Sequence, residues 1–294
     1  MKFNRENTER FSVRELFCLV CCPPLPSKIV AKIAFKPPEP SYVFASDSSR
    51  NNRITFLESD INIANCDRDN LECFFARTSR GNRIACMFVK RCPLARYTIL
   101  FSHGNASDIG LMYPFFLDLC NKVCCNVFGY DYSGYGVSTG RPSEKNMYAD
   151  IDCVWRILIS RYNIRPENII LYGQSLGSVP TVDLAARRKV GAVVLHSPIL
   201  SALRVVYPQM KKTWCCDSFL NIEKVENISS PVLVIHGNND ETVPFSHGVT
   251  LFEKCPCSVN PLWVCGAGHN TVEFHDVYLE RLKNFVHIDL KNFD

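Results

Sequence analysis

The sequence predicts an α/β protein with a mostly parallel, eight-stranded sheet and helices on both of its faces. From about residue 72 onward, short apolar runs alternate with longer segments whose apolar residues recur at helical spacing, as in parallel sheets. One expected strand runs directly into an expected helix through residues 173–177, Gly-Gln-Ser-Leu-Gly. Polar loops that hold Asp240 and His269 follow two later strands. Because the functional groups of such sheets lie on loops at the carboxyl ends of strands, these observations favour an enzyme.

The chain of 294 residues is long enough for one large α/β domain preceded by a short appendage. Hydrophobic residues make up 47% and charged residues 21%, which is ordinary for a globular protein with a substantial core. A proline-rich stretch at 37–40 ends the first part, so we assign residues 1–45 to a leader with its linker and residues 46–294 to the catalytic domain. No apolar run approaches the ~18 residues that span a bilayer, and no cleavable signal pattern is present. We therefore expect the protein on the cytosolic side of membranes.

The expected strands and helices alternate along the domain. Strands are expected at residues 72–77, 83–89, 97–102, 126–131, 168–172, 192–196, 232–236 and 262–265. Helices are expected at residues 111–122, 144–162, 176–188, 246–254 and 274–289. Ser143 stands at the N-cap position of the second helix, and Pro180 is expected to kink the third. Since only residues 197–230 are available for an inserted lid, we expect the lid to be small or absent.

Ser175 lies at the turn between a buried strand and a helix, and this position predicts a nucleophile. Such a turn forces the serine into a strained backbone conformation, and glycines at 173 and 177 avoid collisions of a Cβ with the neighbouring elements. The helix N-terminus behind the hydroxyl favours negative charge there. An ordinary Gly-Ser turn is the alternative, and the strand before and the helix after it argue against that alternative.

A serine hydroxyl needs a base to take its proton and an acid to orient the base. His269 and Asp240 occupy later strand-end loops, and the chain order Ser175, Asp240, His269 is the order expected of an α/β-hydrolase. Glu241 is the alternative acid. An oxyanion hole requires two backbone donors, for which we expect the amides of Leu176 and Asn105. No metal or cofactor is implied.

The leader concentrates positive charge and cysteine. Residues 1–36 hold seven Lys or Arg against three Glu, so the whole net charge of +4 resides there. A neutral body argues against nucleic acid as a partner. The apolar stretch 16–22 is too short to span a bilayer but can lie in its interface, which would place Cys18, Cys21 and Cys22 where S-acylation occurs. The alternative is a short helix packed on the body with inert thiols. Most of the other cysteines, among the sixteen in the chain, lie in apolar patterns and behave as small hydrophobic residues.

Five segments of the sequence resemble the α/β-hydrolase domain-containing 17 proteins. They are Ser-His-Gly-Asn-Ala (102–106), Tyr-Asp-Tyr-Ser-Gly-Tyr-Gly (130–136), Leu-Tyr-Gly-Gln-Ser-Leu-Gly (171–177), Val-Leu-His-Ser-Pro (194–198) and Gly-Ala-Gly-His-Asn (266–270). The leader's Leu-x-Cys-Cys-Pro-Pro is the most specific part of the resemblance.

The resemblance implies the α/β-hydrolase fold and a membrane-anchored serine hydrolase that removes palmitate from cysteines of membrane proteins. It also implies Ser175, Asp240 and His269 as the triad and S-palmitoylation of Cys18, Cys21 and Cys22. The expected location is the cytosolic face of the plasma membrane and endosomes, with the lipid bilayer and S-acylated proteins as partners. Two alternative functions are considered. An esterase or lipase acting on small lipid esters needs the same triad. A catalytically inactive interaction protein would lack a complete triad.

Overall fold

The computed structural model describes residues 34–45, 53–57 and 70–293 of the chain. Its centre is an eight-stranded sheet with the strand order β10-β9-β8-β7-β5-β6-β4-β3. The strands are β3 (Leu71–Arg77), β4 (Arg83–Val89), β5 (Thr98–Ser102), β6 (Asn126–Tyr130), β7 (Ile169–Gln174), β8 (Ala192–His196), β9 (Val232–Gly237) and β10 (Leu262–Val264). All eight strands expected from the sequence are present, with ends that differ by at most two residues.

The sheet is mostly parallel, as predicted. Strand β4 pairs antiparallel with both β3 and β6, and every other pair in the sheet is parallel. The parallel strands therefore end at a common edge of the sheet, which is where the candidate catalytic loops leave it.

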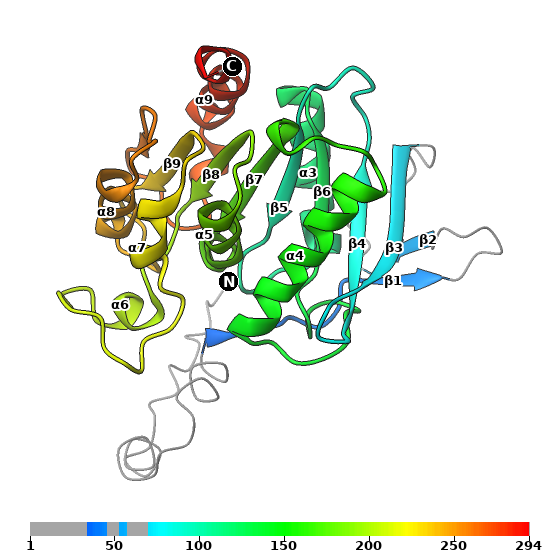
Figure 1. Ribbon diagram of the computed structural model, residues 1–294, viewed down its shortest axis with the longest axis horizontal. Coiled ribbons are helices and arrows are strands. Elements are labelled where there is room, and N and C mark those ends of the chain that lie inside the picture. The colour runs from blue at the N-terminus through cyan, green and yellow to red at the C-terminus, as the bar shows by residue number, and fades with distance from the viewer. Residues whose placement is uncertain (1–33, 46–52, 58–69, 294) are drawn as a thin grey trace, which may run out of the picture.

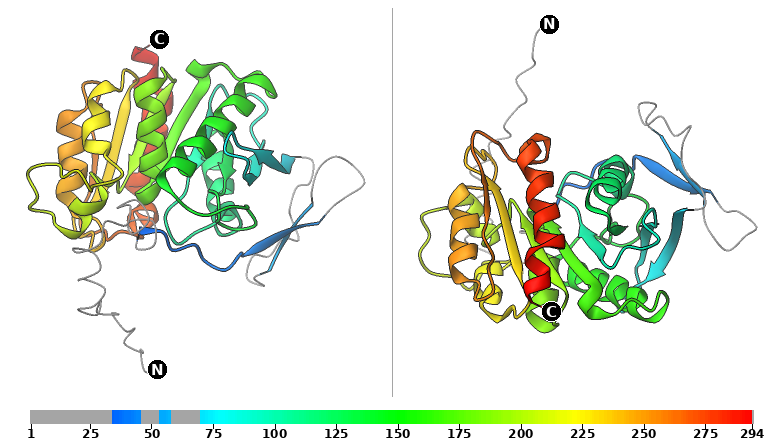
Figure 2. Two further views of the ribbon diagram at one scale, coloured as in Figure 1. Left: turned by 60° about the horizontal axis from the view of Figure 1, so that its bottom comes forward. Right: turned by 90° about the horizontal axis from the view of Figure 1, so that it is seen from above.

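Helices cover both faces of the sheet (Figures 1 and 2). The main helices are α3 (Ile109–Val123), α4 (Glu144–Ser160), α5 (Ser178–Arg187), α8 (Phe245–Lys254) and α9 (Asp276–His287). Helices α4, α5 and α8 contribute to one buried hydrophobic cluster, and α3 and α9 contribute to the other. Alternate residues of β7 enter the two clusters, Leu171 the first and Ile170 and Tyr172 the second, because successive side chains of a strand point to opposite faces.

Two features of the helices differ from the expectation. The α-helical part of the third predicted helix begins only at Ser178, so Pro180 lies in its first turn. A first-turn residue has no intrahelical partner for its amide, so the proline removes no hydrogen bond and the expected kink has no cause. In addition, two short helices, α6 (Ala202–Val206) and α7 (Asn221–Lys224), occupy the segment between β8 and β9. This segment is the small lid region expected from its length.

The last residues of the predicted leader lie on the body of the protein. A two-stranded antiparallel hairpin, β1 (Tyr42–Ala45) and β2 (Arg53–Phe56), precedes the main sheet and was not predicted. The Tyr42 hydroxyl donates to Asp131 Oδ2 over 2.5 Å, and the Ser41 amide donates to Asp108 Oδ2 over 2.8 Å. These contacts fix residues 41–45 beside α3 and β6. The predicted acylation sites Cys18, Cys21 and Cys22 lie outside the described residues.

Cysteines in the described part of the chain carry free thiols. Burial raises the pKa of Cys125 to about 12 and that of Cys153 to about 11, so both remain protonated and unreactive at neutral pH. They pack as small hydrophobic groups, as the sequence indicated. Within the same described ranges, no helix combines the length and the hydrophobicity that crossing a membrane requires.

Candidate active site

Ser175 occupies a strained turn between β7 and α5. Its φ angle is +51°, in the left-handed region that a residue with a side chain rarely adopts. A Cβ on Gly173 would lie 2.6 Å from the Gly177 carbonyl oxygen, and a Cβ on Gly177 would overlap the carbonyl oxygen of Ser102. Both glycines are therefore required by close backbone packing. The turn holds the Ser175 hydroxyl at the carboxyl edge of the sheet, where the motif predicted it.

The structure brings Ser175, His269 and Asp240 together from three separate loops. His269 Nε2 lies 2.9 Å from Ser175 Oγ, and His269 Nδ1 lies 2.7 Å from Asp240 Oδ2. Ser175 follows β7, Asp240 follows β9, and His269 follows β10. This linear arrangement allows the imidazole to take the hydroxyl proton on one nitrogen while the carboxylate orients the other.

Asp240 is held ionised by the groups around it. Its Oδ1 accepts hydrogen bonds from the amides of Thr242 and Val243, at 2.9 and 2.7 Å. Burial raises the pKa of this carboxyl group, but hydrogen bonds from His236, His269 and the Val243 amide outweigh burial and hold the pKa well below its usual value. The carboxylate therefore keeps its charge at neutral pH.

His236 is a part of the site whose role the sequence did not reveal. Its Nε2 lies 3.1 Å from Asp240 Oδ2 and 3.0 Å from the Val243 carbonyl oxygen, so a proton on this nitrogen is shared between two acceptors. The side chain is fully buried against Gly248 of α8. At the end of β9, His236 therefore supports the triad acid.

Glu241, the alternative acid, faces the backbone of the histidine loop. Its Oε2 accepts the His269 amide over 3.2 Å, and no hydrogen bond joins it to the imidazole. Asp240, by contrast, contacts the ring nitrogen directly. The geometry therefore identifies Asp240 as the group that orients His269. Glu241 instead fixes the backbone of the loop that carries His269.

The two expected oxyanion donors lie on adjacent backbone segments. Leu176 is the second residue of a short 3-10 turn, η4 (Ser175–Gly177), so its amide belongs to a first helical turn whose N–H groups have no helical partner. The loop that carries Asn105 leaves β5 at Ser102, and the missing side chain of Gly177 lets that backbone approach the nucleophile turn. This packing places residues 102 and 103, at the start of the Asn105 loop, against the Ser175 turn.

The Asn105 side chain clamps the segment that connects the leader to the body. Its Oδ1 accepts the Lys36 amide over 2.9 Å and the Tyr135 hydroxyl over 2.7 Å, while its Nδ2 donates to the Ala34 carbonyl oxygen over 2.6 Å. Phe35, between the two clamped residues, is buried with 7% of its surface exposed. The described chain thus enters the body directly beside the candidate oxyanion loop.

Another histidine supports this loop from below. The His103 ring is buried, and its Nε2 lies 3.3 Å from Asp131 Oδ1. The backbone carbonyl oxygen of His103 accepts a hydrogen bond from the Tyr132 hydroxyl over 2.6 Å. Asp131 Oδ1 also accepts the Ile109 amide at the start of α3. The Tyr-Asp-Tyr segment after β6 therefore fixes the base of the Asn105 loop.

Behind the candidate triad lies a buried network of polar groups. His196 Nδ1 lies 3.0 Å from the Tyr172 hydroxyl, which lies 2.6 Å from that of Tyr278. Burial lowers the pKa of His196 to about 3, and it raises the pKa of Glu273, whose Oε2 lies 3.9 Å from His196 Nε2. His196 is therefore neutral, and the Asp240 carboxylate is the group that contacts His269 Nδ1 directly.

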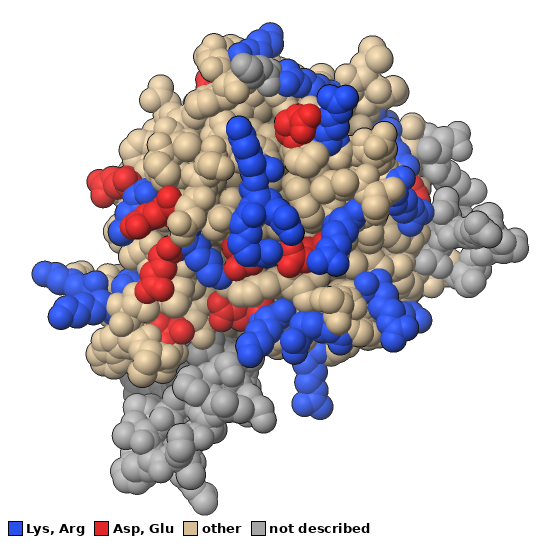
Figure 3. Space-filling model, viewed as in Figure 1, with Lys and Arg blue, Asp and Glu red and all other residues tan. Residues whose placement is uncertain are grey.

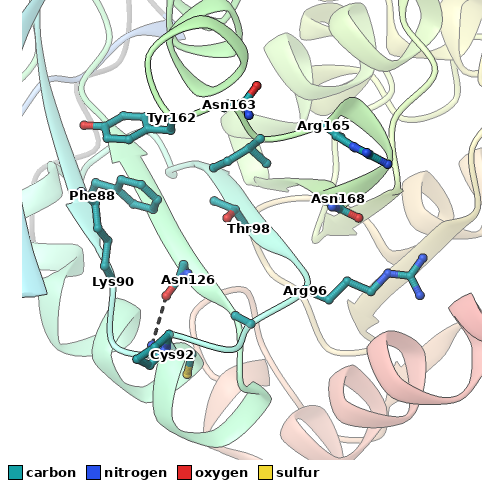
Figure 4. Close-up of a pocket in the computed structure, with 13 residues that line it drawn as sticks. Phe88, Lys90, Cys92, Arg96, Thr98, Asn126, Tyr162, Asn163, Arg165 and Asn168 are labelled. Carbon is teal, nitrogen blue, oxygen red and sulfur yellow. Dashed lines mark hydrogen bonds between the residues drawn. The ribbon is translucent and has the colours of Figure 1, made fainter.

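A pocket of about 510 Å³ opens at the opposite edge of the sheet (Figure 4). Thr98 and Asn126 begin β5 and β6, and Asn168 immediately precedes β7, so this pocket lies at the amino ends of the strands. The triad lies at their carboxyl ends. The pocket is therefore separate from the site that the catalytic groups form.

The strained serine turn, the hydrogen-bonded Ser-His-Asp arrangement and the mostly parallel sheet define a serine hydrolase of the α/β-hydrolase fold. Residues 94–221 match the model of a protein family described as serine aminopeptidase, S33. The chain is 56% identical over 283 residues to α/β hydrolase domain-containing protein 17B of Homo sapiens, which covers 96% of this chain and 98% of that protein. It is 50% identical over 309 residues to α/β hydrolase domain-containing protein 17C of Mus musculus, and this match covers 96% of this chain and 97% of that protein. The chain belongs to the α/β hydrolase domain-containing protein 17 family.

Solved structures with the same fold include esterases. A Pyrococcus furiosus esterase matches with a TM-score of 0.62 and 18% identity over 82% of this chain and 98% of its own. Est1E of Butyrivibrio proteoclasticus, solved with ferulic acid bound, matches with a TM-score of 0.59 and 16% identity. The match covers 72% of this chain and 97% of Est1E. At these identities the likeness establishes the fold alone.

The geometry around His269 makes a prediction about the acid. Asp240→Asn removes the charge that orients the imidazole, so kcat on a soluble ester should fall about 10⁴-fold, as loss of a triad acid typically costs. Glu241→Gln is the matched control: it keeps an acceptor for the His269 amide and should leave kcat close to that of the wild type. Steady-state kinetics with both purified variants checks this. A large loss in Glu241→Gln with near-normal turnover in Asp240→Asn would reverse the assignment.

Proposed function

We propose that the protein is an acyl-protein thioesterase that removes S-palmitoyl groups from cysteines of membrane-associated proteins. The observation that carries the proposal is the hydrogen-bonded line from Ser175 through His269 to Asp240 at a strained turn. Membership of the protein 17 family and a lid region limited to residues 197–231 support it. A small lid suits an acyl chain that is presented on the surface of another protein.

In the proposed reaction, Ser175 Oγ attacks the thioester carbonyl carbon while His269 Nε2 takes the hydroxyl proton. The amides of Leu176 and Asn105 stabilise the oxyanion of the tetrahedral intermediate. Its collapse breaks the carbon–sulfur bond, and His269 returns the proton to the departing cysteine thiolate. A water molecule, deprotonated by His269, then attacks the acyl-serine ester. The second collapse releases the fatty acid and regenerates the Ser175 hydroxyl.

An esterase acting on small lipid esters is the second candidate, because oxygen esters and thioesters require the same groups. The solved structures establish the fold alone and do not separate the two candidates. The two candidates differ in whether the enzyme turns over an acyl group carried by a protein cysteine.

Turnover of palmitoylated protein separates these candidates. Purified wild-type protein should release palmitate from an S-palmitoylated peptide reconstituted in vesicles, whereas Ser175→Ala should show no release because it lacks the nucleophile. The loss of the thioester is followed by mass spectrometry of the peptide, and circular dichroism verifies that the variant is folded. If the wild type cleaves a lipid oxygen ester but leaves the palmitoylated peptide intact, the esterase assignment replaces this one.

We further propose that S-acylation of Cys18, Cys21 and Cys22 holds the protein on the cytosolic face of membranes, including the plasma membrane and endosomes. Burial of an apolar side chain contributes about 1.5–3 kcal/mol, and ordering the backbone costs about 1–2 kcal/mol per residue, so the short stretch 16–22 alone binds weakly. An acyl chain adds about 0.8 kcal/mol for each buried CH₂. Since the described chain begins at Ala34 beside the Asn105 loop, an anchor upstream would keep the site close to the bilayer.

This anchor can be tested with the three cysteines replaced by serine in the full chain. The triple variant should move from the membrane fraction to the soluble fraction of cells, because it has lost the acyl chains. A triple variant at Cys73, Cys124 and Cys265, also changed to serine, is the matched control and should stay with the membranes. Membrane localisation of the leader variant equal to that of the wild type would contradict the proposal.

A further inference from the structure

The side chain and the backbone of Asn105 have separate tasks. The side-chain Oδ1 accepts hydrogen bonds from the Lys36 amide over 2.9 Å and from the Tyr135 hydroxyl over 2.7 Å. The side-chain Nδ2 donates to the Ala34 carbonyl oxygen over 2.6 Å. Among the described residues, no backbone–backbone hydrogen bond uses the Asn105 amide. The side chain thus holds the residue in place, while the amide is the group expected to stabilise an oxyanion.

The chain from Ala34 to Tyr42, which we call the linker segment, is tied to the Asn105 loop at two places. One is the Asn105 side chain itself. The other is Asp108, which accepts the Ser41 amide over 2.8 Å and the Ser41 hydroxyl over 2.5 Å. Asp108 also accepts the Leu111 amide in the first turn of α3. The linker segment therefore braces the loop from Asn105 to the start of α3.

Phe35 anchors the linker segment through apolar packing. Its side chain is 7% exposed and belongs to the same buried hydrophobic cluster as Leu176, the other expected oxyanion donor. The Phe35 ring packs edge-on against Tyr135, at 6.4 Å between centroids, and against Phe219, at 5.6 Å. Because Tyr135 also donates to Asn105, the apolar contact and the hydrogen bonds hold the same loop.

The backbone beside Asn105 has little support of its own. Gly104 lacks a side chain, and a Cβ placed there would meet no atom within 4 Å. A glycine in open space leaves the backbone free to adopt several conformations. An oxyanion donor stabilises the transition state only when it is held in place beforehand, and a misplacement of about 1 Å costs about 100-fold in rate. The contacts of the Asn105 side chain supply this restraint.

The contacts that hold residues 34–36 are uncharged. They use backbone groups, an amide side chain and an aromatic ring. Figure 3 shows basic and acidic side chains together on the face that carries α4 and α5, where Arg187 lies 3.3 Å from Asp152. Salt weakens surface ion pairs of that kind. Docking of residues 34–36 should therefore be insensitive to salt.

We propose that residues 34–36 are a positioning element of the active site. By holding the Asn105 side chain, they fix the Asn105 amide where the oxyanion of the tetrahedral intermediate forms. Asn105 and Phe35 are then positioning residues for turnover, although neither side chain touches the substrate. The inference rests on the oxyanion role that the proposed function gives to the Asn105 amide, and it makes turnover depend on docking of the segment next to the leader.

Kinetics of the full-length, non-acylated protein on a soluble ester test the proposal. Asn105→Ala keeps the backbone amide but loses the hydrogen bonds to the linker segment and to Tyr135. Its kcat should fall about 100-fold, as expected for a misplaced oxyanion donor, while KM stays close to that of the wild type. An alkyl trifluoromethyl ketone forms a tetrahedral adduct with Ser175 that carries an oxyanion. Its inhibition constant should rise by the same factor as kcat/KM falls.

Variants at Phe35 test the apolar part of the docking. Phe35→Ala should lower kcat about tenfold or more at both low and high salt, because the linker segment loses its anchor. Phe35→Leu fills the apolar site again and should recover most of the activity. Asn168→Ala, at the opposite edge of the sheet, and Val286→Ala, buried in α9, are controls that should keep the wild-type kcat. Val286→Ala should lower the thermal midpoint, so it separates lost stability from lost positioning.

Three results would overturn the proposal. One is a wild-type kcat in the Asn105→Ala variant, shown to be folded by circular dichroism. Another is a loss confined to KM or thermal stability with unchanged affinity for the ketone, which would make the role of residues 34–36 purely structural. The third is an equal loss in Phe35→Leu and Phe35→Ala. A wild type that hydrolyses the soluble ester but not a palmitoylated peptide would overturn the thioesterase proposal alone.

Discussion

The close contact of three backbone segments at the Ser175 turn is the constraint on which the rest of the site depends. Ser175 adopts a positive φ of 51°, and Gly177 has no Cβ, so the backbone at Ser102 can lie directly against the turn. That contact sets the position of the Asn105 loop relative to the nucleophile. The Asn105 side chain in turn holds Ala34 and Lys36, so the position of the leader's end follows from the same packing. Local strain at the serine is thus compensated by packing that spans the whole edge of the sheet.

The charge on the triad acid likewise depends on the groups packed around it. Asp240 is buried beside three hydrogen-bond donors that favour its charged form, whereas burial keeps the nearby His196 imidazole neutral. One fixed negative charge therefore faces His269 Nδ1. This charge stabilises the imidazolium that forms when the Ser175 proton is transferred. Burial alone would raise the pKa of the carboxyl group, and the His236 and Val243 contacts reverse that effect.

Much of the fold and the main site could be predicted from the sequence, because both depend on local patterns. Each central strand is a buried apolar run, and the serine turn has a fixed spacing of glycines. The hairpin of β1 and β2 could not be predicted, since its position depends on distant partners such as Asp108 and Asp131. For the same reason the sequence did not reveal that His236 supports Asp240, or that the Asn105 side chain clamps residues 34–36. These roles arise only when loops far apart in the chain meet at one edge of the sheet.

The central claim, that Ser175 is the nucleophile activated by His269, is tested most directly by locating a covalent adduct. The full-length protein is treated with a fluorophosphonate, digested, and examined by tandem mass spectrometry. The account predicts a single phosphonylated peptide with the adduct on Ser175, and strongly reduced labelling in a folded His269→Ala variant. An adduct on another serine, or labelling of Ser175 that is unaffected by the loss of His269, would contradict it.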